Sequence, residues 1–180
     1  MIKVLILAIS LVAVTLSSPL TNDVIASAQL GNAAAQEELG EHYFKEAEGY
    51  SYKQNITKHQ GSKEKFNNDI ESNKSEALRW LHAAARNGSK RAFYYLGSYF
   101  NVCCWGEENV DSAFYYWSEG SKRGEKYSQK KLAYLYLNGI GCEKDIIKAH
   151  ILSWKSFFHG NISTPLMWIA KWLDIDTYVS

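Results

Sequence analysis

The sequence predicts an all-α fold, a right-handed α-solenoid built from stacked antiparallel helix pairs. Self-similarity is the first indication, because Ala77, Ala113 and Ala149 stand 36 residues apart and many neighbouring positions repeat with them. The second is the spacing of apolar residues within each unit, at i, i+3, i+4 and i+7, which places them on one helix face. A pair of short helices cannot bury such a face alone, so we expect successive pairs to stack.

The composition indicates one folded domain. Of 180 residues, 46% are apolar and 14% are aromatic, which excludes an intrinsically disordered chain. The 20 Lys and Arg residues nearly balance the 19 Asp and Glu residues, so bulk charge gives no basis for nucleic-acid binding. We therefore expect a single solenoid over residues 18–174 with a short tail over 175–180, and no nucleic acid among its partners.

Residues 1–17 are predicted to be a secretory signal peptide. Lys3 precedes an apolar run that extends to Leu16, which is the length of a signal-peptide hydrophobic region. The run is shorter than the about 20 apolar residues of a transmembrane helix. We expect cleavage after Ser17; cleavage after Ala28 and an uncleaved anchor are the alternatives. Export would place the mature chain in the periplasm or outside the cell, where conditions are oxidising.

Two kinds of helix-boundary residue recur at the 36-residue interval. Side chains that cap a helix N-terminus stand before the apolar stretches, at Asn73, Asn109 and Asp145. Glycines that can leave a helix with a positive φ follow those stretches, at Gly88, Gly124 and Gly160. These residues predict where each second helix begins and ends.

The first and last units depart from the regular interval. Leu39 and Leu96 are 57 residues apart, which is 21 more than one repeat. The additional residues fall within 46–72, a stretch rich in Lys, Asn, Ser, Glu and Gln that we expect to be a long exposed loop. At the other end, a Ser-Thr-Pro sequence predicts a helix start, and residues 163–174 are expected to cap the stack as a short helix.

The chain resembles the Sel1-like repeat family, a relative of the tetratricopeptide repeat. The residues that match the family pattern are Ala77-x-x-Trp80-x-x-x-Ala84-Ala85-x-x-Gly88, Ala35-x-x-x-Leu39-Gly40-x-x-Tyr43 and Asp145-x-x-Lys148-Ala149. The match extends over about residues 28–160. The chain departs from the pattern where Cys103 and Cys104 occupy an expected Gly-x-Gly turn, and where Cys142 replaces the usual Val.

The resemblance implies a protein-interaction scaffold. Exported bacterial members of the family resemble envelope proteins, adaptors or host-interaction factors, and a cysteine-rich branch is associated with β-lactam binding and hydrolysis. The resemblance also implies that the first helix of each pair lines the concave face. Tyr and Arg are favoured interface residues, and adjacent tyrosines cannot both face the core. The candidate groove residues are Arg91, Tyr94, Ser98, Lys130, Tyr134 and Asn138.

The three cysteines are candidates for a disulfide. Cys142 and the Cys103–Cys104 pair lie at equivalent turns of adjacent repeats, so a bridge from Cys142 to either of the other two could tie the stack together. An odd number of cysteines leaves one thiol unpaired or available to another molecule. The chain is therefore expected to be a monomer or a dimer.

The sequence offers no catalytic or metal-binding pattern, and we expect no cofactor. Ser-x-x-Lys occurs at Ser62–Lys65 and Ser128–Lys131, but the companion motifs of penicillin-recognising enzymes are absent. The histidines are scattered and form no metal-ligand motif. We therefore expect a non-enzymatic, exported scaffold that binds a protein or peptide. The alternatives are a hydrolase or binding protein for β-lactams or cell-wall material, and an adaptor that binds peptidoglycan at the cell envelope.

Overall fold

The computed structural model describes residues 20–56, 60–101 and 109–158. Within these ranges the chain forms seven α-helices and no strand, which confirms the predicted all-α class. The helices are α2 (Asn22–Gln29), α3 (Ala33–Ile56), α4 (Gln60–Arg86), α5 (Arg91–Phe100), α6 (Val110–Lys122), α7 (Lys126–Asn138) and α8 (Ile146–Phe158).

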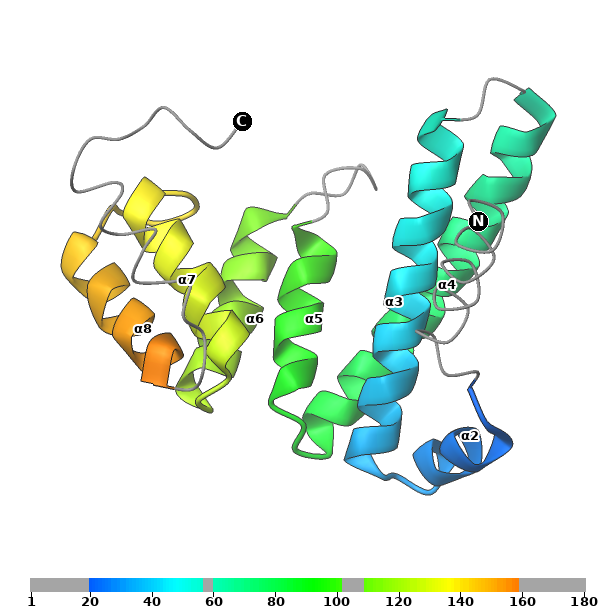
Figure 1. The fold of residues 1–180 in the computed structure, drawn as a ribbon, viewed down its shortest axis with the longest axis horizontal. Coiled ribbons are helices and arrows are strands. Elements are labelled where there is room, and N and C mark those ends of the chain that lie inside the picture. The colour runs from blue at the N-terminus through cyan, green and yellow to red at the C-terminus, as the bar shows by residue number, and fades with distance from the viewer. Residues whose placement is uncertain (1–19, 57–59, 102–108, 159–180) are drawn as a thin grey trace, which may run out of the picture.

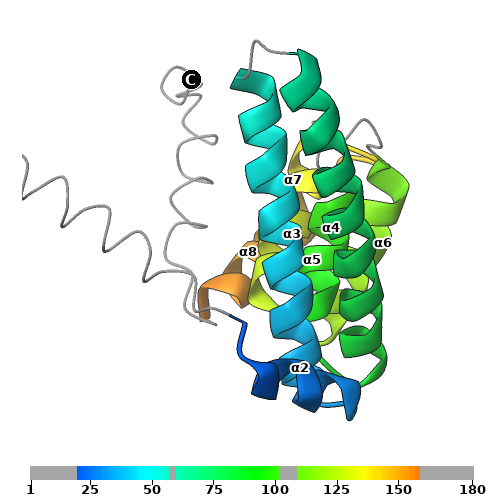
Figure 2. The ribbon, with the colours of Figure 1, turned by 90° about the vertical axis from the view of Figure 1, so that its right-hand side faces the viewer.

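The helices are arranged as stacked antiparallel pairs. Figure 1 shows the pairs following one another in order, from α3 and α4 at one end, through α5 and α6, to α7 and α8 at the other. Figure 2, turned by 90°, shows how far α3 and α4 run alongside each other. The predicted α-solenoid is therefore confirmed, with α3, α5 and α7 as the first helices of successive pairs and α4, α6 and α8 as the second.

The predicted boundary residues are confirmed in the regular pairs. Asn109 caps α6, since its Oδ1 accepts a hydrogen bond from the Ser112 amide at 2.8 Å. The Oδ1 of Asp145 accepts one from the Lys148 amide at 2.8 Å, at the start of α8. Gly88 and Gly124 take φ values of 97° and 75° as the chain leaves α4 and α6, a conformation that glycine adopts without strain. Gly160 lies outside the described residues.

The capping role predicted for Asn73 is wrong. Asn73 lies in the interior of α4, and its Nδ2 donates to the Asp69 carbonyl oxygen at 2.7 Å, one turn earlier in the same helix. The physical reason is that the preceding segment is itself helical. No free first-turn amides are present for the Asn73 side chain to accept from.

The long exposed loop predicted for residues 46–72 is also wrong. Residues 46–56 extend α3 and residues 60–72 belong to α4, so the two helices form a hairpin; residues 57–59 lie outside the described residues. Ala47 and Ser51 of α3 and Ile70 of α4 are buried. Small and apolar side chains at helical spacing thus pack one arm against the other, while the polar residues cover the outer faces.

Polar and aromatic contacts also join the two arms of the hairpin. The rings of Tyr50 and Phe66 lie 6.2 Å apart, and the Gln54 side-chain amide donates to the Asn67 side chain. Each arm therefore has its packing partners in the other arm. The segment predicted to be a loop is an extension of the first repeat.

Glycines allow first and second helices to pack closely. Gly97 of α5 lies so near the indole of Trp117 on α6 that a Cβ there would overlap the ring. Trp117 is 1% exposed, and its Nε1 donates to the Tyr94 carbonyl oxygen at 3.2 Å. At Gly40 of α3, a Cβ would come within 2.6 Å of the Leu81 side chain on α4. The buried apolar side chains form three successive clusters along the stack.

None of the helices in the described part of the chain combines the length and apolar composition needed to cross a membrane. Three predicted segments lie outside the described residues. They are the signal peptide over 1–17, the capping helix over 163–174 and the tail over 175–180. They remain predictions.

Candidate functional site

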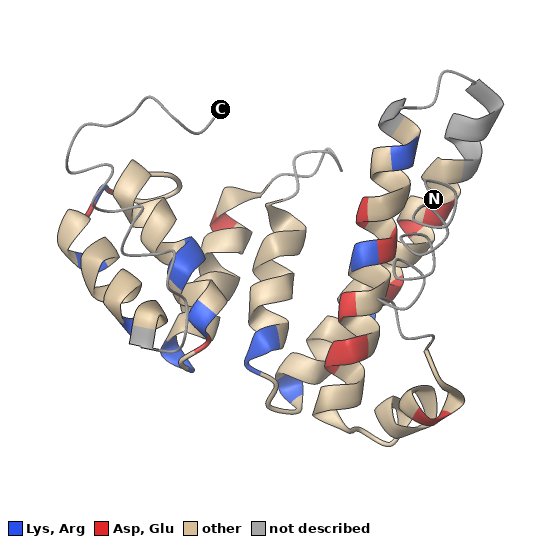
Figure 3. Cartoon of the chain, viewed as in Figure 1, with Lys and Arg blue, Asp and Glu red and all other residues tan. Residues whose placement is uncertain are grey.

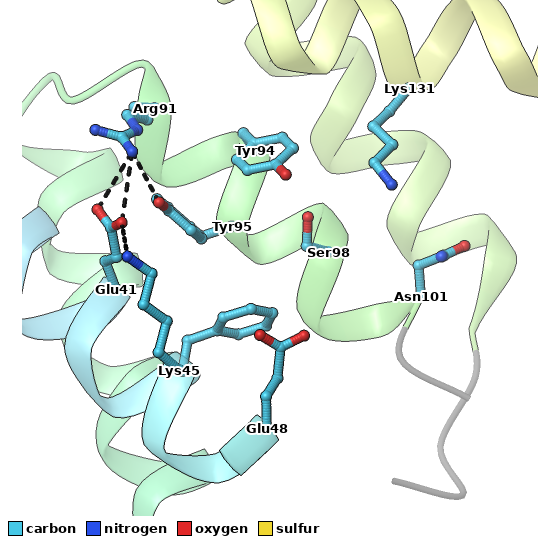
Figure 4. Close-up of a pocket in the computed structure, with 10 residues that line it drawn as sticks. Glu41, Lys45, Glu48, Arg91, Tyr94, Tyr95, Ser98, Asn101 and Lys131 are labelled. Carbon is cyan, nitrogen blue, oxygen red and sulfur yellow. Dashed lines mark hydrogen bonds and ion pairs between the residues drawn. The ribbon is translucent and has the colours of Figure 1, made fainter. Parts of the chain in front are cut away.

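A cavity of about 550 Å³ opens on the face that the first helices share. α3 supplies Glu41, Phe44, Lys45 and Glu48, α5 and its C-terminal end supply Arg91, Tyr94, Tyr95, Ser98 and Asn101, and α7 supplies Lys131. Figure 4 shows these side chains pointing towards one another from the three helices. Walls from three successive pairs therefore enclose one site.

Charges of opposite sign are concentrated on different walls. Figure 3 shows acidic residues along α3, whereas α5 and α7 contain basic residues and no Asp or Glu. The cavity thus has a mainly acidic wall on one side and a basic wall on the other.

At one end of the cavity, charged groups form a closed network. The Glu41 carboxylate pairs with Lys45 Nζ at 2.6 Å and with Arg91 Nη2 at 3.4 Å, and Arg91 also pairs with Glu37 at 3.7 Å. Arg91 Nη2 donates to the Tyr95 hydroxyl oxygen at 2.9 Å. This network joins α3 to α5 and leaves little capacity for a ligand.

The network changes the ionisation of its members. Burial acts to raise the pKa of the Glu41 carboxyl, but hydrogen bonds from Lys45 and Tyr95 and the charge of Arg91 outweigh it and lower that pKa. Burial, together with the neighbouring Glu41, raises the pKa of the Tyr95 hydroxyl far above its usual value. Tyr95 therefore stays protonated and Glu41 stays ionised near neutral pH.

At the other end of the cavity, Glu48 and Lys131 face each other without contact (Figure 4). Burial raises the pKa of the Glu48 carboxyl, and burial together with the charge of Lys130 lowers the pKa of the Lys131 ammonium. Within the described residues neither group forms an ion pair. Lys131 Nζ instead lies 5.6 Å from the centre of the Trp117 ring.

Aromatic and polar groups lie between the two ends. The Tyr94 ring is 5.1 Å from that of Tyr95 and 5.4 Å from that of Tyr127, and burial raises the pKa of the Tyr94 hydroxyl. Ser98 and Asn101 add hydroxyl and amide groups to the lining. Such a mixture of rings, hydrogen-bonding groups and charges is suited to binding a ligand.

The structure brings half of the predicted groove residues together. Arg91, Tyr94 and Ser98 line the cavity. The other three lie on α7 outside the lining: Lys130 is half-buried, Tyr134 is 47% exposed, and the Nδ2 of Asn138 donates to the Tyr134 carbonyl oxygen at 2.8 Å.

Sequence reasoning missed Lys131 and the residues contributed by α3. A signal for the α3 residues was available, because Glu41, Lys45 and Glu48 are spaced i, i+4 and i+7 on a first helix. Lys131 had no such signal. Its neighbour Lys130 aligns with Tyr94 at the 36-residue interval, and only the packing of α7 against α5 shows that Lys131 enters the cavity.

The predicted disulfide falls largely outside the described residues. Cys103 and Cys104 are not described, so their pairing with Cys142 stays a prediction. Cys142 itself is half-buried against the core cluster of α6, α7 and α8, and burial raises the pKa of its thiol. A raised thiol pKa disfavours the thiolate, which is the reactive form of cysteine.

The second Ser-x-x-Lys sequence does not form a nucleophile site. Ser128 is fully buried, and its side chain packs against Gly120 of α6. Lys131 of the same sequence lies in the cavity, so the two side chains serve different environments. The side chains of Ser62 and Lys65 are not described. Across the described residues, no three His, Cys, Asp or Glu side chains gather in a group that could hold a metal ion.

Two segments of the chain match a known repeat family. The Sel1 repeat family matches at residues 66–89, which end at the turn after α4, and at residues 126–152, which span α7 and half of α8. The chain therefore contains Sel1 repeats over these two segments. The identification agrees with the sequence resemblance and with the stacked helix pairs.

Two solved structures of Sel1 repeat proteins resemble this chain to different degrees. A Sel1 repeat protein from Oxalobacter formigenes is 25% identical, with a TM-score of 0.59 over 81% of this chain and 93% of that chain. A protective antigen present in uropathogenic Escherichia coli strains, which displays an SLR fold, is 19% identical with a TM-score of 0.47. That match covers 82% of this chain and 35% of the antigen. Among curated proteins, none matches the chain.

Proposed function

We propose that this Sel1-like repeat protein is an exported, non-enzymatic scaffold that binds a polypeptide partner in the cavity between α3, α5 and α7. Sel1 repeats are consistent with protein–protein interaction in general. The observation that carries the proposal for this chain is the cavity itself, where Tyr94, Ser98 and Asn101 lie between charged walls. Tyr and Arg side chains in partly enclosed sites provide much of the energy of protein interfaces.

Binding accounts for the cavity better than catalysis does. A hydrolytic site needs a nucleophile within hydrogen-bond reach of a general base. Among the described lining residues, the basic groups Arg91 and Lys45 are held by Glu41, and no hydrogen bond joins the Ser98 hydroxyl to Lys131 or Glu48. The cavity therefore provides contacts without an activated nucleophile.

Export is part of the proposal and rests on residues 1–17. An apolar run after Lys3, of signal-peptide length, supports it. Cell fractionation tests it: we expect the mature chain, beginning at Ser18, outside the cytoplasm. Recovery of a full-length chain in the cytoplasmic fraction would count against export.

The binding proposal is tested by capturing partners with the mature chain, using chemical crosslinking and mass spectrometry. We expect a reproducible polypeptide partner that is lost in Tyr94→Ala. Tyr115→Ala is the matched control, because Tyr115 is 58% exposed on α6 and does not line the cavity. Circular dichroism should show both variants folded.

Two other results would redirect the proposal. Retention on purified cell-wall glycan without any protein partner would favour the adaptor alternative. Turnover of a chromogenic β-lactam that is abolished by Ser128→Ala would favour the hydrolase alternative, although full burial of Ser128 argues against it.

A further inference from the structure

The two ends of the cavity differ in how their charges are satisfied. Glu41, Lys45 and Arg91 pair with one another at one end, as does Arg91 with the Tyr95 hydroxyl. At the other end, Glu48 on α3 and Lys131 on α7 line the same cavity and attract each other, as Lys45 attracts Glu48, but within the described residues neither forms an ion pair in direct contact. The first end stabilises the fold, and the second is left for a ligand.

Holding two charges in this way has a cost that a ligand can offset. A charged group that is partly removed from water loses hydration, and the loss is recovered only when an opposite charge reaches it. Burial opposes ionisation of both Glu48 and Lys131, which is what this loss of hydration produces. The free protein already bears this loss of hydration. A ligand charge that pairs with Glu48 or Lys131 therefore recovers the energy that the loss of hydration costs.

The lining between Glu48 and Lys131 favours a ligand with both signs of charge. The acidic group belongs to the α3 wall and the basic group to the α7 wall, with the Tyr94 ring, Ser98 and Asn101 nearby. A uniformly acidic or uniformly basic ligand would pair with one wall and be repelled by the other. A ligand that carries a carboxylate and an ammonium or guanidinium group would pair with both.

Two adjoining cavities provide a path that an extended chain can follow. A second cavity of about 390 Å³, lined by Lys126 and Tyr127 among others, adjoins the first and shares Arg91 with it. The rings of Tyr94 and Tyr127 contact each other at the boundary between the two cavities. An extended peptide spans about 3.3 Å per residue and can follow such a path.

We infer that the cavity binds a peptide segment carrying one acidic and one basic side chain, with the acidic one paired to Lys131 and the basic one paired to Glu48. The inference rests on the proposed function and names the partner chemistry of the same site. Fixed charges on opposite walls also set the direction in which the peptide lies.

Synthetic peptides of about ten residues test the inference, since they are long enough to cross the cavity. Four sets share the same uncharged residues and carry either Glu with Lys, Glu alone, Lys alone or no charge. Fluorescence anisotropy measures binding to the mature chain. We expect the mixed-charge set to bind about tenfold more tightly than any other, because only that set can pair with both walls of the cavity.

Two conservative variants localise the effect. Lys131→Met should weaken mixed-charge binding by about tenfold, and Glu48→Gln should do the same. Lys130→Met and Glu38→Gln are the matched controls, because each removes a like charge from the same helix at a residue outside the cavity lining. Lys131→Met and Glu48→Gln should unfold no more easily than the parent chain, which separates a binding role from a structural one.

A charge reversal provides the sharpest test. Of two peptides that differ only in the order of Glu and Lys, the parent chain should prefer one. The double variant Glu48→Lys with Lys131→Glu should prefer the other. A merely structural role for these two residues would not reverse the preference.

The outcomes are distinguishable. Equal binding of uncharged and mixed-charge peptides would overturn the charge inference and leave the proposed function standing. Loss of mixed-charge binding in Lys130→Met but not in Lys131→Met would overturn the assignment of the site. Binding of free glutamate or lysine without binding of any peptide would overturn the peptide ligand. Failure to bind any peptide, together with failure to capture any polypeptide, would remove the proposed function as well.

Discussion

The α3–α4 hairpin and the regular pairs from α5 to α8 solve the same packing problem at different lengths. α3 and α4 have 24 and 27 residues, whereas α5 has 10 and α6 has 13. Yet a glycine with positive φ, Gly88 or Gly124, stands two residues after the end of both α4 and α6. The comparison teaches that a helix pair can lengthen without disturbing the repeat, if it does so at the end far from its junction, which is the turn that leads to the next pair.

The two regions should differ in how many neighbouring helices pack against them. Near the junction, α3 and α4 pack on α2 and α5, and Gly40 allows the close approach of Leu81. Beyond it, within the described residues, the arms of the hairpin pack on each other through Ala47, Ser51 and Ile70. In the regular part, α6 packs on α5 and on α7. Amide hydrogens in the outer hairpin are therefore expected to exchange before those of α6 and α7.

The largest expected effect comes from removing one aromatic ring in each region. Trp117→Ala should lower the free energy of unfolding by about 3–5 kcal/mol, because it empties a fully enclosed site between α5, α6 and α7. Tyr50→Ala in the hairpin should cost less than about 1.5 kcal/mol, since its ring is half-buried against Phe66. Urea unfolding followed by circular dichroism measures both. Equal losses would mean that the hairpin is as firmly packed as the repeats.

The same glycine-to-alanine change should have opposite signs in the two regions. Gly97→Ala should destabilise the chain by about 1–3 kcal/mol, because the new Cβ meets the Trp117 indole. Gly49→Ala should stabilise it by about 0.5–1 kcal/mol, because Gly49 lies within α3 with nothing near its Cβ position and alanine favours the helix. Thermal melts of the two variants provide the measurement. A gain at Gly97 would show that α5 and α6 can separate freely.

Two asparagines that the repeat aligns should also respond differently. Asn109→Ala should cost about 1 kcal/mol, because it removes the cap of α6. Asn73→Ala should change stability by less than about 0.5 kcal/mol, because Asn73 is interior to α4 and alanine has the higher helix propensity. Chemical denaturation distinguishes them, and a similar loss at both sites would restore a helix start at Asn73.

The smallest effects concern pH, and their signs differ between the regions. Burial raises the folded-state pKa of Glu48, so the charged carboxylate disfavours folding above that pKa. Glu48→Gln should therefore raise the melting temperature at pH 7 but not near pH 3. Hydrogen bonds from the backbone amide and side chain of Lys148 lower the pKa of Asp145. The Asp145 carboxylate therefore stabilises the fold at neutral pH, and this contribution is lost as the pH falls through the folded-state pKa. Asp145→Asn should therefore lower the melting temperature at pH 7 only. Calorimetric melts at the two pH values measure both, and matching signs would contradict the assignment.

Features that depend on neighbouring residues could be predicted from the sequence. Asn109 and Asp145 accept hydrogen bonds from first-turn amides of α6 and α8, and Gly88 and Gly124 permit the turn that follows each second helix. The 36-residue interval locates these positions and with them the order of the helices. Local chemistry and the repeat together therefore predicted the solenoid.

Features that depend on tertiary contacts were predicted less well. The segment 46–72 is polar enough to suggest a loop, but its few buried side chains, such as Ala47 and Ile70, recur at helical spacing and are sufficient for two arms that cover each other. Lys131 was missed because the repeat aligns Lys130 with Tyr94, while the rotation of α7 against α5 decides which lysine enters the cavity. That rotation is set by packing and has no signature in the spacing of residues.

The extended hairpin also has an evolutionary consequence. Glu48 stands on a part of α3 whose packing partners lie in the other arm, so its position can change while the core around Leu81 stays the same. Gain or loss of whole helical turns, matched between the two arms, would raise, lower or remove one side of the cavity. Lineages that keep the same stack could thus diverge in ligand preference by altering the length of a single pair.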